Sequence, residues 1–599
     1  MFQSFEKQSS PEFGALRVAM LRDVMEEHGL DGFLVPRADA HQGEYVAPHD
    51  ARLTWLTGFT GSAGFAVILQ RKAGIFIDGR YRLQVTEQVN TKLLTPVNWP
   101  EVKLSDWLIE MMPKGGTIGF DPWLHVTAEI EGLRKTLGPK GITLQPTDNL
   151  VDEIWSDQPD PPAGRLLAWS DELAGETSAE KRARLAGDLK TAGQSAAVLT
   201  LPDSIMWLLN TRGEDIPRVP VAHGFAILHS DASVDFFTRA VPTDDVDLGP
   251  DVRLCKPEDL RAMLKVLIGQ VRLDRQTAPV AIADLIEEGD AEIIWDRDPC
   301  VLPKAKKTKA EIAATTEAHL RDAVAMCEFL AWLAGELAKG GLSEITVVMA
   351  LEGFRRATNQ LLDISFDTIL GSGPNGAIIH YRVDKDSNRM IEPGELVVID
   401  SGGQYIDGTT DITRTIAFGD PGADAKKAFT RVLQGMIGIS RLRFPTGVTG
   451  AHLDAVARAP LWMAGQDYDH GTGHGVGVYL SVHEGPARIS RASDVPLEPG
   501  MILSNEPGYY RDGAFGIRIE NLIVVAEADA LPGGDAHRKM LNFRTLTLVP
   551  IARDLIVAEM LSPGERAWLN GYHARCRELL GAKLSPEALA WLVRATAPI

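Results

Sequence analysis

The stretch ELVVIDSGGQYIDGTTDITRTIAF (395–418) decides the fold of the C-terminal half of the chain. Asp400 ends one apolar run and Asp411 opens the next, with a polar, glycine-containing segment between them. In an antiparallel hairpin, paired residues have numbers with a constant sum. Pairing Asp400 with Asp411 places the midpoint at residues 405 and 406, next to a turn-like Asp-Gly pair. We therefore predict a hairpin in which both carboxylates point to the same place.

The same pattern returns downstream. Glu506 lies in MILSNEPGYY and Glu520 lies in FGIRIENLIVV, and their midpoint is Gly513 in the turn signal Arg-Asp-Gly. This predicts a second hairpin that opposes the two glutamates. Arg518 is two residues from Glu520, so it is expected on the same side of its strand.

Four carboxylates in one place would repel each other, hold protons or bind cations. Two divalent ions would neutralise them, and a neutral imidazole would complete a mixed oxygen and nitrogen ligand set suited to manganese, cobalt, zinc or iron. The best candidate for that imidazole is His474 in GTGHGVG, because the flanking glycines allow close backbone approach.

Three other histidines are candidates for acid–base or oxyanion roles without binding metal: His380 in IIHYR, His470 before the glycine-rich loop, and His483 in VHEGP. Each of these residues, taken alone, could have a purely structural role instead of a functional one. An aspartate at a strand end is often a turn or cap residue, and a histidine in a glycine-rich loop often makes a structural hydrogen bond. Their joint arrangement is what indicates a site.

Composition narrows the class of protein. The chain has 599 residues, 45% hydrophobic and 24% charged, with a formal net charge of −20. Such an acidic chain disfavours nucleic acid and anionic membranes as partners. No apolar run approaches the ~20 residues of a membrane-spanning helix, and the N-terminus has no apolar signal core. The four cysteines form no CxxC pair, so we expect reduced thiols and a cytoplasmic protein.

The N-terminal half contains a repeated pattern. Ser195–Leu201 resembles Gly32–Pro36, and Gly224–Leu228 resembles Gly64–Leu69, in the same order and at similar spacing. Short apolar runs of this kind are typical of buried strands. We therefore predict a duplicated α/β domain.

Two breaks and two helical patterns divide the chain. The breaks are the proline-rich Asp157–Gly164 and the lysine-rich Pro303–Lys309, the latter expected to be a solvated linker or helix start. Helical spacing covers Glu311–Leu337 and returns in Ala567–Leu580. The expected domains are residues 1–165, 166–305, 306–534 and 535–599.

Short sequence motifs in the C-terminal half resemble those of the pita-bread metallopeptidases, and among them the aminopeptidase P family. The motifs that carry this resemblance are DSGGQYIDGTTDITRT (400–415), HGTGHGVG (470–477), VHEGP (482–486), SNEPGYY (504–510) and GIRIEN (516–521). Upstream, HQGEYVAPHDARLTWLTGFTGSAG (41–64) and WLLNTRGEDIP (207–217) are similar to the long, three-domain form of that family.

The resemblance implies a mixed α/β and α+β fold. Two creatinase-like N-terminal α/β domains, residues 1–165 and 166–305, would precede a pita-bread catalytic domain at 306–534. A C-terminal extension at 535–599 would take part in dimerisation, because the long form is commonly a homodimer.

The resemblance also implies two divalent metal ions, with Mn²⁺ favoured and Zn²⁺ or Co²⁺ as alternatives. The family's two bridging carboxylates correspond to Asp411 and Glu520. The full set of implied ligands is Asp400, Asp411, His474, Glu506 and Glu520.

The implied reaction releases the N-terminal residue from peptides with proline at the second position, by attack of a metal-bridging hydroxide on the Xaa-Pro bond. Glu506 would move the proton of the attacking water, and His483 would stabilise the oxyanion. His380 and His470 would shape the proline pocket and orient the bond, so that His380 counts with His483 and Glu506 as catalytic. Arg518 would support the site through hydrogen bonds and, with the three histidines, belong to the substrate-binding set.

Alternative functions differ in substrate or in the presence of metal. A prolidase would accept only Xaa-Pro dipeptides, and the ligands alone do not separate it from an aminopeptidase, although two N-terminal domains favour the latter. Creatinase and a histone-chaperone domain are metal-free relatives. The complete ligand set argues against both, because a purely structural domain needs no five converging ligands.

Overall fold

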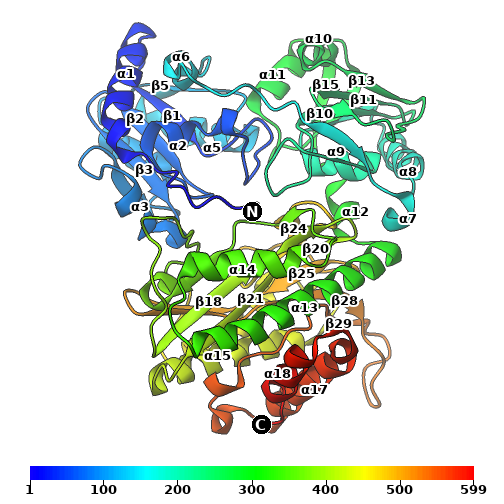
Figure 1. Cartoon of the computed structure of the whole chain (residues 1–599). Coiled ribbons are helices and arrows are strands. Elements are labelled where there is room, and N and C mark those ends of the chain that lie inside the picture. The colour runs from blue at the N-terminus through cyan, green and yellow to red at the C-terminus, as the bar shows by residue number, and fades with distance from the viewer. The chain divides into compact units, whose positions relative to one another are not determined.

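The computed structural model describes all 599 residues, which form two compact units. Unit 1 consists of Met1–Lys7, Glu172–Gly175 and Leu302–Ile599, and unit 2 of Gln8–Asp171 and Glu176–Val301 (Figure 1). None of the helices combines the length and the apolar character that crossing a membrane requires.

Unit 2 contains two six-stranded sheets with the same topology. The first has the order β4-β3-β2-β1-β5-β6 and the second β13-β11-β10-β8-β14-β15. In both, the three central strands pair antiparallel and the outer strands pair parallel. The strands of the first sheet are β1 (Gly32–Pro36), β2 (Phe65–Leu69), β3 (Ala73–Ile77), β4 (Thr95–Asn98), β5 (Gly116–Phe120) and β6 (Ile142–Pro146).

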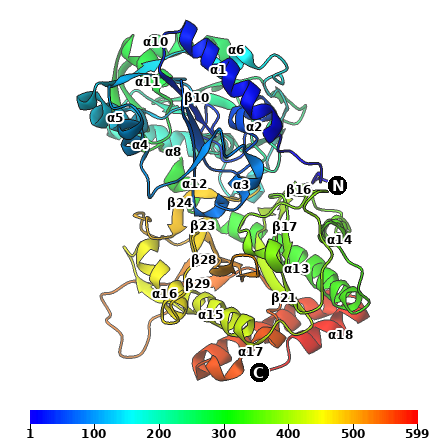
Figure 2. The ribbon, with the colours of Figure 1, turned by 90° about the vertical axis from the view of Figure 1, so that its left-hand side faces the viewer.

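The second sheet repeats this arrangement strand for strand. Its members are β8 (Ala196–Leu199), β10 (Gly224–His229), β11 (Val234–Thr238), β13 (Val252–Cys255), β14 (Ile268–Leu273) and β15 (Asp290–Trp295). The repeated segments of the sequence correspond to β1 and β8 and to β2 and β10, so the predicted duplication is confirmed. Helices such as α1 (Gly14–Glu27), α5 (Thr127–Leu137), α8 (Ser178–Thr191) and α11 (Val280–Glu287) accompany the sheets (Figure 2).

Unit 1 is built from sheets flanked by long helices. One sheet has the order β17-β18-β21, a larger one β22-β29-β28-β25-β23-β24, and β26 pairs with β27. The strands that hold the site are β18 (Glu395–Ser401), β21 (Ile412–Phe418), β23 (Gly473–Gly475), β24 (Glu484–Ile489), β25 (Ile502–Asn505), β26 (Gly508–Arg511), β27 (Phe515–Arg518) and β28 (Asn521–Glu527). The other strands of these sheets are β17 (Ile369–Ser372), β22 (Arg443–Pro445) and β29 (Met540–Thr545).

Helices cover these sheets and form the main core with them. They are α13 (Lys309–Leu337), α14 (Glu344–Arg356), α15 (Ala423–Ser440), α16 (Gly450–Trp462), α17 (Pro563–Leu580) and α18 (Pro586–Ala595). Phe329 of α13, Val397 of β18 and Phe429 of α15 are fully buried in one cluster with Leu569 of α17. The helical patterns predicted at 311–337 and 567–580 therefore both bury their apolar residues here.

The lysine-rich break at 303–309 agrees with the prediction in part. It comprises the end of α12 (Val301–Ala305) and, as expected, the start of α13, but two of its lysines are not solvated. Lys304 and Lys307 are buried, and their ammonium groups both reach the carboxylate of Glu484. A buried carboxylate needs such counter-charges, which is a tertiary demand that the local sequence does not display. The break at 157–164, in contrast, has no helix or strand, as expected.

The first predicted hairpin is present with a shifted register. Asp400 pairs with Thr413 rather than with Asp411, so the turn lies slightly further along the chain. Because side chains alternate along a strand, a shift of two residues keeps Asp411 on the predicted face. The second hairpin has the predicted register, since Gly508 pairs with Arg518 and Arg511 with Phe515.

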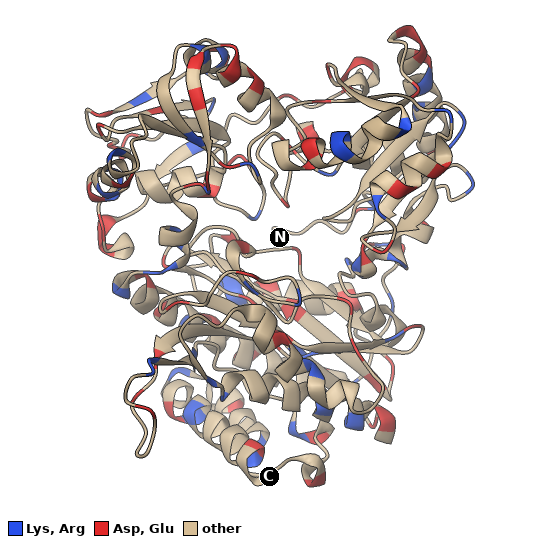
Figure 3. Ribbon diagram, turned by 180° about the vertical axis from the view of Figure 1, so that it is seen from behind, with Lys and Arg blue, Asp and Glu red and all other residues tan.

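Charged residues of both signs are scattered over both units (Figure 3). Unit 1 also contains acidic residues in its interior, where Asp400, Asp411 and Glu520 are each less than 9% exposed. Buried carboxylates are rare unless they are paired or bind metal. These three residues mark the candidate site.

Candidate metal centre

Strands of two sheets bring the predicted ligands together, four of them at or next to a strand end. Asp400 lies near the end of β18 and Asp411 immediately before β21, and Glu520 separates β27 from β28. His474 is the middle residue of β23, and Glu506 follows β25. Since β23 pairs with β25, and β25 with β28, the second set of ligands is carried on neighbouring strands.

Their ligand atoms form one connected cluster. Asp400, Asp411 and Glu520 have ligand atoms within 4.8 Å of one another, and so do His474, Glu506 and Glu520. His474 Nε2 lies 3.4 Å from Asp411 Oδ2 and 3.6 Å from Glu506 Oε1. The structure therefore brings all five predicted ligands together.

The cluster has too little positive charge for its carboxylates. Burial raises the pKa of Glu506 to about 7 and that of Glu520 well above its usual range, and it also raises the pKa of Asp400. The Oδ1 atoms of Asp400 and Asp411 are buried without a hydrogen-bond partner. Carboxylate oxygens that are buried without a donor, and carboxylates with raised pKa values, are both typical of a site that binds cations.

The imidazole of His474 is oriented for metal binding. Its Nδ1 lies 3.0 Å from the carbonyl oxygen of Gly475, and a carbonyl can only accept, so Nδ1 carries the proton. Nε2 is thereby left to face the carboxylates, as is usual for metal-binding histidines. Burial opposes protonation of this ring, but Asp411 and Glu506 raise its pKa to about 9. The donor set thus fits two divalent cations, which would displace these protons.

Glycines allow the strands to approach at this point. A Cβ on Gly473 would lie 2.0 Å from the carbonyl oxygen of Ser504, and one on Gly475 would lie 2.2 Å from that of Glu484. Any side chain at either position would push β23 away from its neighbours. The glycines around His474 therefore serve backbone packing, as the sequence predicted.

Arg518 links the carboxylates to a tyrosine that sequence reasoning missed. Its guanidinium donates to Asp400 Oδ2 at 2.6 Å, to Thr413 Oγ1 at 3.2 Å and to the hydroxyl of Tyr510 at 2.6 Å. Thr413 in turn donates to Glu520 Oε2 at 2.9 Å. The pairing of β26 with β27 could have pointed to Tyr510, which lies on the strand opposite Arg518.

The three additional histidines take different positions. The ring of His483 packs edge-on against His474 with centroids 4.2 Å apart, and its ligand atom joins those of Asp411 and His474 within 4.8 Å. His470 Nε2 lies 2.9 Å from the Tyr510 hydroxyl, and its Nδ1 lies 4.0 Å from Glu506 Oε2.

His380 lies on a loop beside the strands of the site. It is half-buried in the loop after η6 (Gly373–Ala377), a short helix that packs on β18 and β27. It contributes to none of the groups of potential metal ligands. The structure therefore brings His470 and His483 to the cluster and places His380 on a neighbouring loop.

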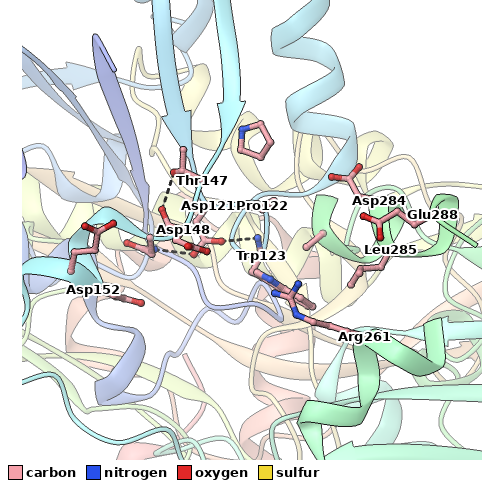
Figure 4. Close-up of a pocket in the computed structure, with 14 residues that line it drawn as sticks. Asp121, Pro122, Trp123, Thr147, Asp148, Asp152, Arg261, Asp284, Leu285 and Glu288 are labelled. Atoms are coloured by element: carbon pink, nitrogen blue, oxygen red, sulfur yellow. Dashed lines mark hydrogen bonds between the residues drawn. The ribbon is translucent and has the colours of Figure 1, made fainter. Parts of the chain in front are cut away.

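A large cavity lies elsewhere, in unit 2. It has a volume of about 810 Å³, and its lining includes six acidic side chains and Arg261, which lies over the ring of Trp123 at 5.1 Å (Figure 4). The buried Asp121 at its wall accepts hydrogen bonds from Asn149 and from the backbone of Trp123. None of the predicted site residues lines it, so cavity size does not locate the metal centre.

Four family descriptions match successive segments that together make up most of the chain. Residues 313–527 match the description metallopeptidase family M24, and residues 539–599 match the C-terminal region of peptidase M24. Residues 17–154 and 157–311 each match a creatinase/prolidase N-terminal domain.

Individual relatives cover nearly the whole chain. It is 39% identical to a probable Xaa-Pro aminopeptidase P of Talaromyces stipitatus, over 97% of this chain and 92% of that protein. It is 38% identical to aminopeptidase P2 of Arabidopsis thaliana, over 97% and 88%. Among solved structures, the X-prolyl aminopeptidase of Caenorhabditis elegans, described as a cytosolic enzyme with a di-nuclear active site, matches with a TM-score of 0.91 and 32% identity, covering 98% of this chain and 100% of that one.

Proposed function

The chain belongs to the Xaa-Pro aminopeptidase P family within metallopeptidase family M24, and on this premise we propose how its residues carry out the reaction. It is a metal-dependent aminopeptidase that removes the N-terminal residue from peptides with proline at the second position. The observation that carries this function is the convergence of three buried carboxylates, Glu506 and His474 in one cluster.

Two divalent cations are the cofactor of this chemistry. Asp400, Asp411, His474, Glu506 and Glu520 would hold these cations. The proximity of the ligand atoms supports this set, because Glu520 lies within 4.8 Å of Asp400 and Asp411 in one group and of His474 and Glu506 in another. The oxygen-rich ligand set favours Mn²⁺ over Zn²⁺ or Co²⁺.

When bound, the cations polarise a water and lower its pKa, which provides the nucleophile near neutral pH. Glu506 takes the proton of that water and passes it to the proline nitrogen as the bond breaks. Glu506 is placed for this exchange, because its carboxylate lies in the cluster beside His474, 3.6 Å from Nε2 of that ring. His483, next to His474, donates to the oxyanion that develops on the carbonyl, an effect worth about 3–4 kcal/mol for a well-placed donor.

The remaining site residues orient the groups that react. Arg518 orients Asp400 through a hydrogen bond. It also donates to the hydroxyl groups of Tyr510 and Thr413, which fix the position of the guanidinium. His470 and His380 shape the space for the proline ring and the peptide bond before it. Proline has no amide N–H, so a pocket for its ring must replace the hydrogen bond that other proteases make there.

We propose the domain boundaries 1–165, 166–305, 306–534 and 535–599. The family matches support them, since they end and restart close to these positions. The structure groups the first two domains into one compact unit. We also propose that the enzyme is a cytoplasmic homodimer whose last domain takes part in the subunit contact; the description of the Caenorhabditis elegans enzyme as cytosolic supports the location.

Hydrolysis of Arg-Pro-Pro and of the dipeptide Arg-Pro by metal-stripped protein, before and after addition of Mn²⁺, tests this function. Release of arginine from the tripeptide only after metal is added is the expected result. Cleavage of the dipeptide alone would make the chain a prolidase. If neither peptide is cleaved while metal is bound, the proposed substrate is wrong.

A further inference from the structure

A second group of metal-binding side chains surrounds a small cavity in unit 2. Asp39 follows β1, Asp50 ends η2 (Pro48–Asp50), and His223 directly precedes β10. Their ligand atoms lie within 4.8 Å of one another, and all three residues line a cavity of about 180 Å³. This volume exceeds that of a few waters, so a hydrated cation fits it. The group is separate from the unit 1 centre and plays no part in the reaction described above.

Asp39 directs one carboxylate oxygen at His223. Its side chain is only 2% exposed, and Oδ1 accepts hydrogen bonds from the backbone N–H groups of His41 and Gly43, both at 2.9 Å. The ion-pair partner of Oδ2 is His223 Nε2 at 3.2 Å, which is itself one of the three candidate ligands. A divalent cation bound between these two atoms would take the place of the imidazole proton.

The neighbouring arginine does not supply enough charge. Arg52 donates hydrogen bonds to Asp152 from Nε at 2.6 Å and from Nη2 at 2.8 Å. It donates to Asp50 Oδ1 only from Nη1, at 2.9 Å. One guanidinium is therefore shared between two carboxylates, and the ion-pair partner of Asp39 is the candidate ligand His223. Burial raises the pKa of Asp50, and the nearby charge of Asp39 adds to the effect. The arginine that lines the cavity, Arg239, pairs with Glu258.

His223 is held in place from several sides. Its backbone N–H donates to Asp215 Oδ2 and its carbonyl accepts from Thr238 Oγ1, both at 2.7 Å. Its ring lies against the ring of His41, with centroids 4.7 Å apart. His41 Nδ1 donates to the carbonyl oxygen of Thr200 at 3.1 Å, and burial lowers the pKa of His41 to about 4, so that this ring is neutral. Fixed rings of this kind are typical of the surroundings of metal ligands.

We propose that Asp39, Asp50 and His223 form a structural metal site that binds a first-row divalent cation such as Zn²⁺, with water completing the coordination. Asp39 and Asp50 come from the first six-stranded half of unit 2 and His223 from the second. A bound cation joins these halves, and it stabilises unit 2 because the unfolded chain cannot hold the three ligands together.

The test is the Zn²⁺ content of the full-length protein after metal stripping, incubation with Zn²⁺ and dialysis, measured by mass spectrometry. Asp39→Asn and His223→Gln should each contain one Zn²⁺ fewer per chain than the unchanged protein. The matched control is His229→Gln, because His229 also pairs with an aspartate, Asp235 at 3.0 Å, but lies outside the cavity. It should keep the full content.

Binding strength gives a second readout. Loss of one of three protein ligands should weaken Zn²⁺ binding at this site by more than about 100-fold, since even residues that only support a ligand cost 10–100-fold. Added Zn²⁺ should also raise the melting temperature less in Asp39→Asn than in His229→Gln. Equal Zn²⁺ content in all four proteins would overturn the proposal. That result would leave the aminopeptidase function untouched, because the counts are compared with an unchanged unit 1 centre.

Discussion

The Glu484→Gln substitution is expected to destabilise unit 1 strongly. The carboxylate of Glu484 lies between two ammonium groups, 3.0 Å from Lys304 Nζ and hydrogen-bonded to Lys307 Nζ, and all three side chains are only 2% exposed. Removing one partner of a buried ion pair costs about 3–5 kcal/mol, because the other charge remains buried and uncompensated. Here two ammonium groups would be left, so we expect a loss within or above that range.

Two lysine substitutions in the same segment provide matched controls. Lys306 pairs with Glu498 at 3.1 Å, but these side chains are 41% and 44% exposed, so Lys306→Met should cost less than about 1 kcal/mol. Lys307→Met leaves one lysine for one carboxylate at Glu484, a neutral pair. It should therefore cost less than Glu484→Gln, although the two substitutions remove the same contact.

Guanidinium unfolding of the metal-loaded proteins, followed by tryptophan fluorescence, measures these differences as shifts of the transition midpoint. The expected order of stability loss is Glu484→Gln first, then Lys307→Met, then Lys306→Met. Because Glu484 begins β24 beside His483, peptide hydrolysis should also fall in Glu484→Gln. A midpoint for Glu484→Gln equal to that of Lys306→Met would refute the argument from buried charge.

Two further predictions concern the metal centre. Metal loading at pH 7 should release at least one proton, because His474, Glu506 and Glu520 all have raised pKa values in the absence of cations and so hold protons that the cations displace; metal affinity should therefore rise with pH. Titration calorimetry in buffers of different ionisation enthalpy counts these protons, and a count of zero would contradict the assigned ligands. Tyr510→Phe removes the hydroxyl between Arg518 and His470, and it should lower kcat about tenfold while leaving the bound metal unchanged. An unaltered kcat and pH profile would show that this hydroxyl positions nothing.

The paired carboxylates could be predicted because hairpin geometry is local. The downstream pair was placed with the correct register, since the turn around Gly513 fixes it. The upstream pair was shifted by two residues, because β18 continues to Ser401 and pairs with β21 up to that residue. The face was still correct, since side chains alternate with a period of two.

Features that depend on distant segments could not be predicted in this way. In the sequence, the lysines near residue 305 resemble a solvated linker or helix start. Their contacts with Glu484, about 180 residues away, form only in the folded chain. Asp39 and His223 lie in different halves of a duplicated unit, and no spacing in the sequence connects them. Tyr510 lies in the motif SNEPGYY, but its role depends on a hydrogen bond from the guanidinium of Arg518 on the paired strand.

The most direct measurement of the central claim is an anomalous diffraction map from crystals grown with Mn²⁺. The account predicts two peaks in unit 1, each within coordination distance of Asp411 and Glu520, with Asp400 on one cation and His474 and Glu506 on the other. A single peak, or two peaks that share neither Asp411 nor Glu520, would contradict the assigned dinuclear centre.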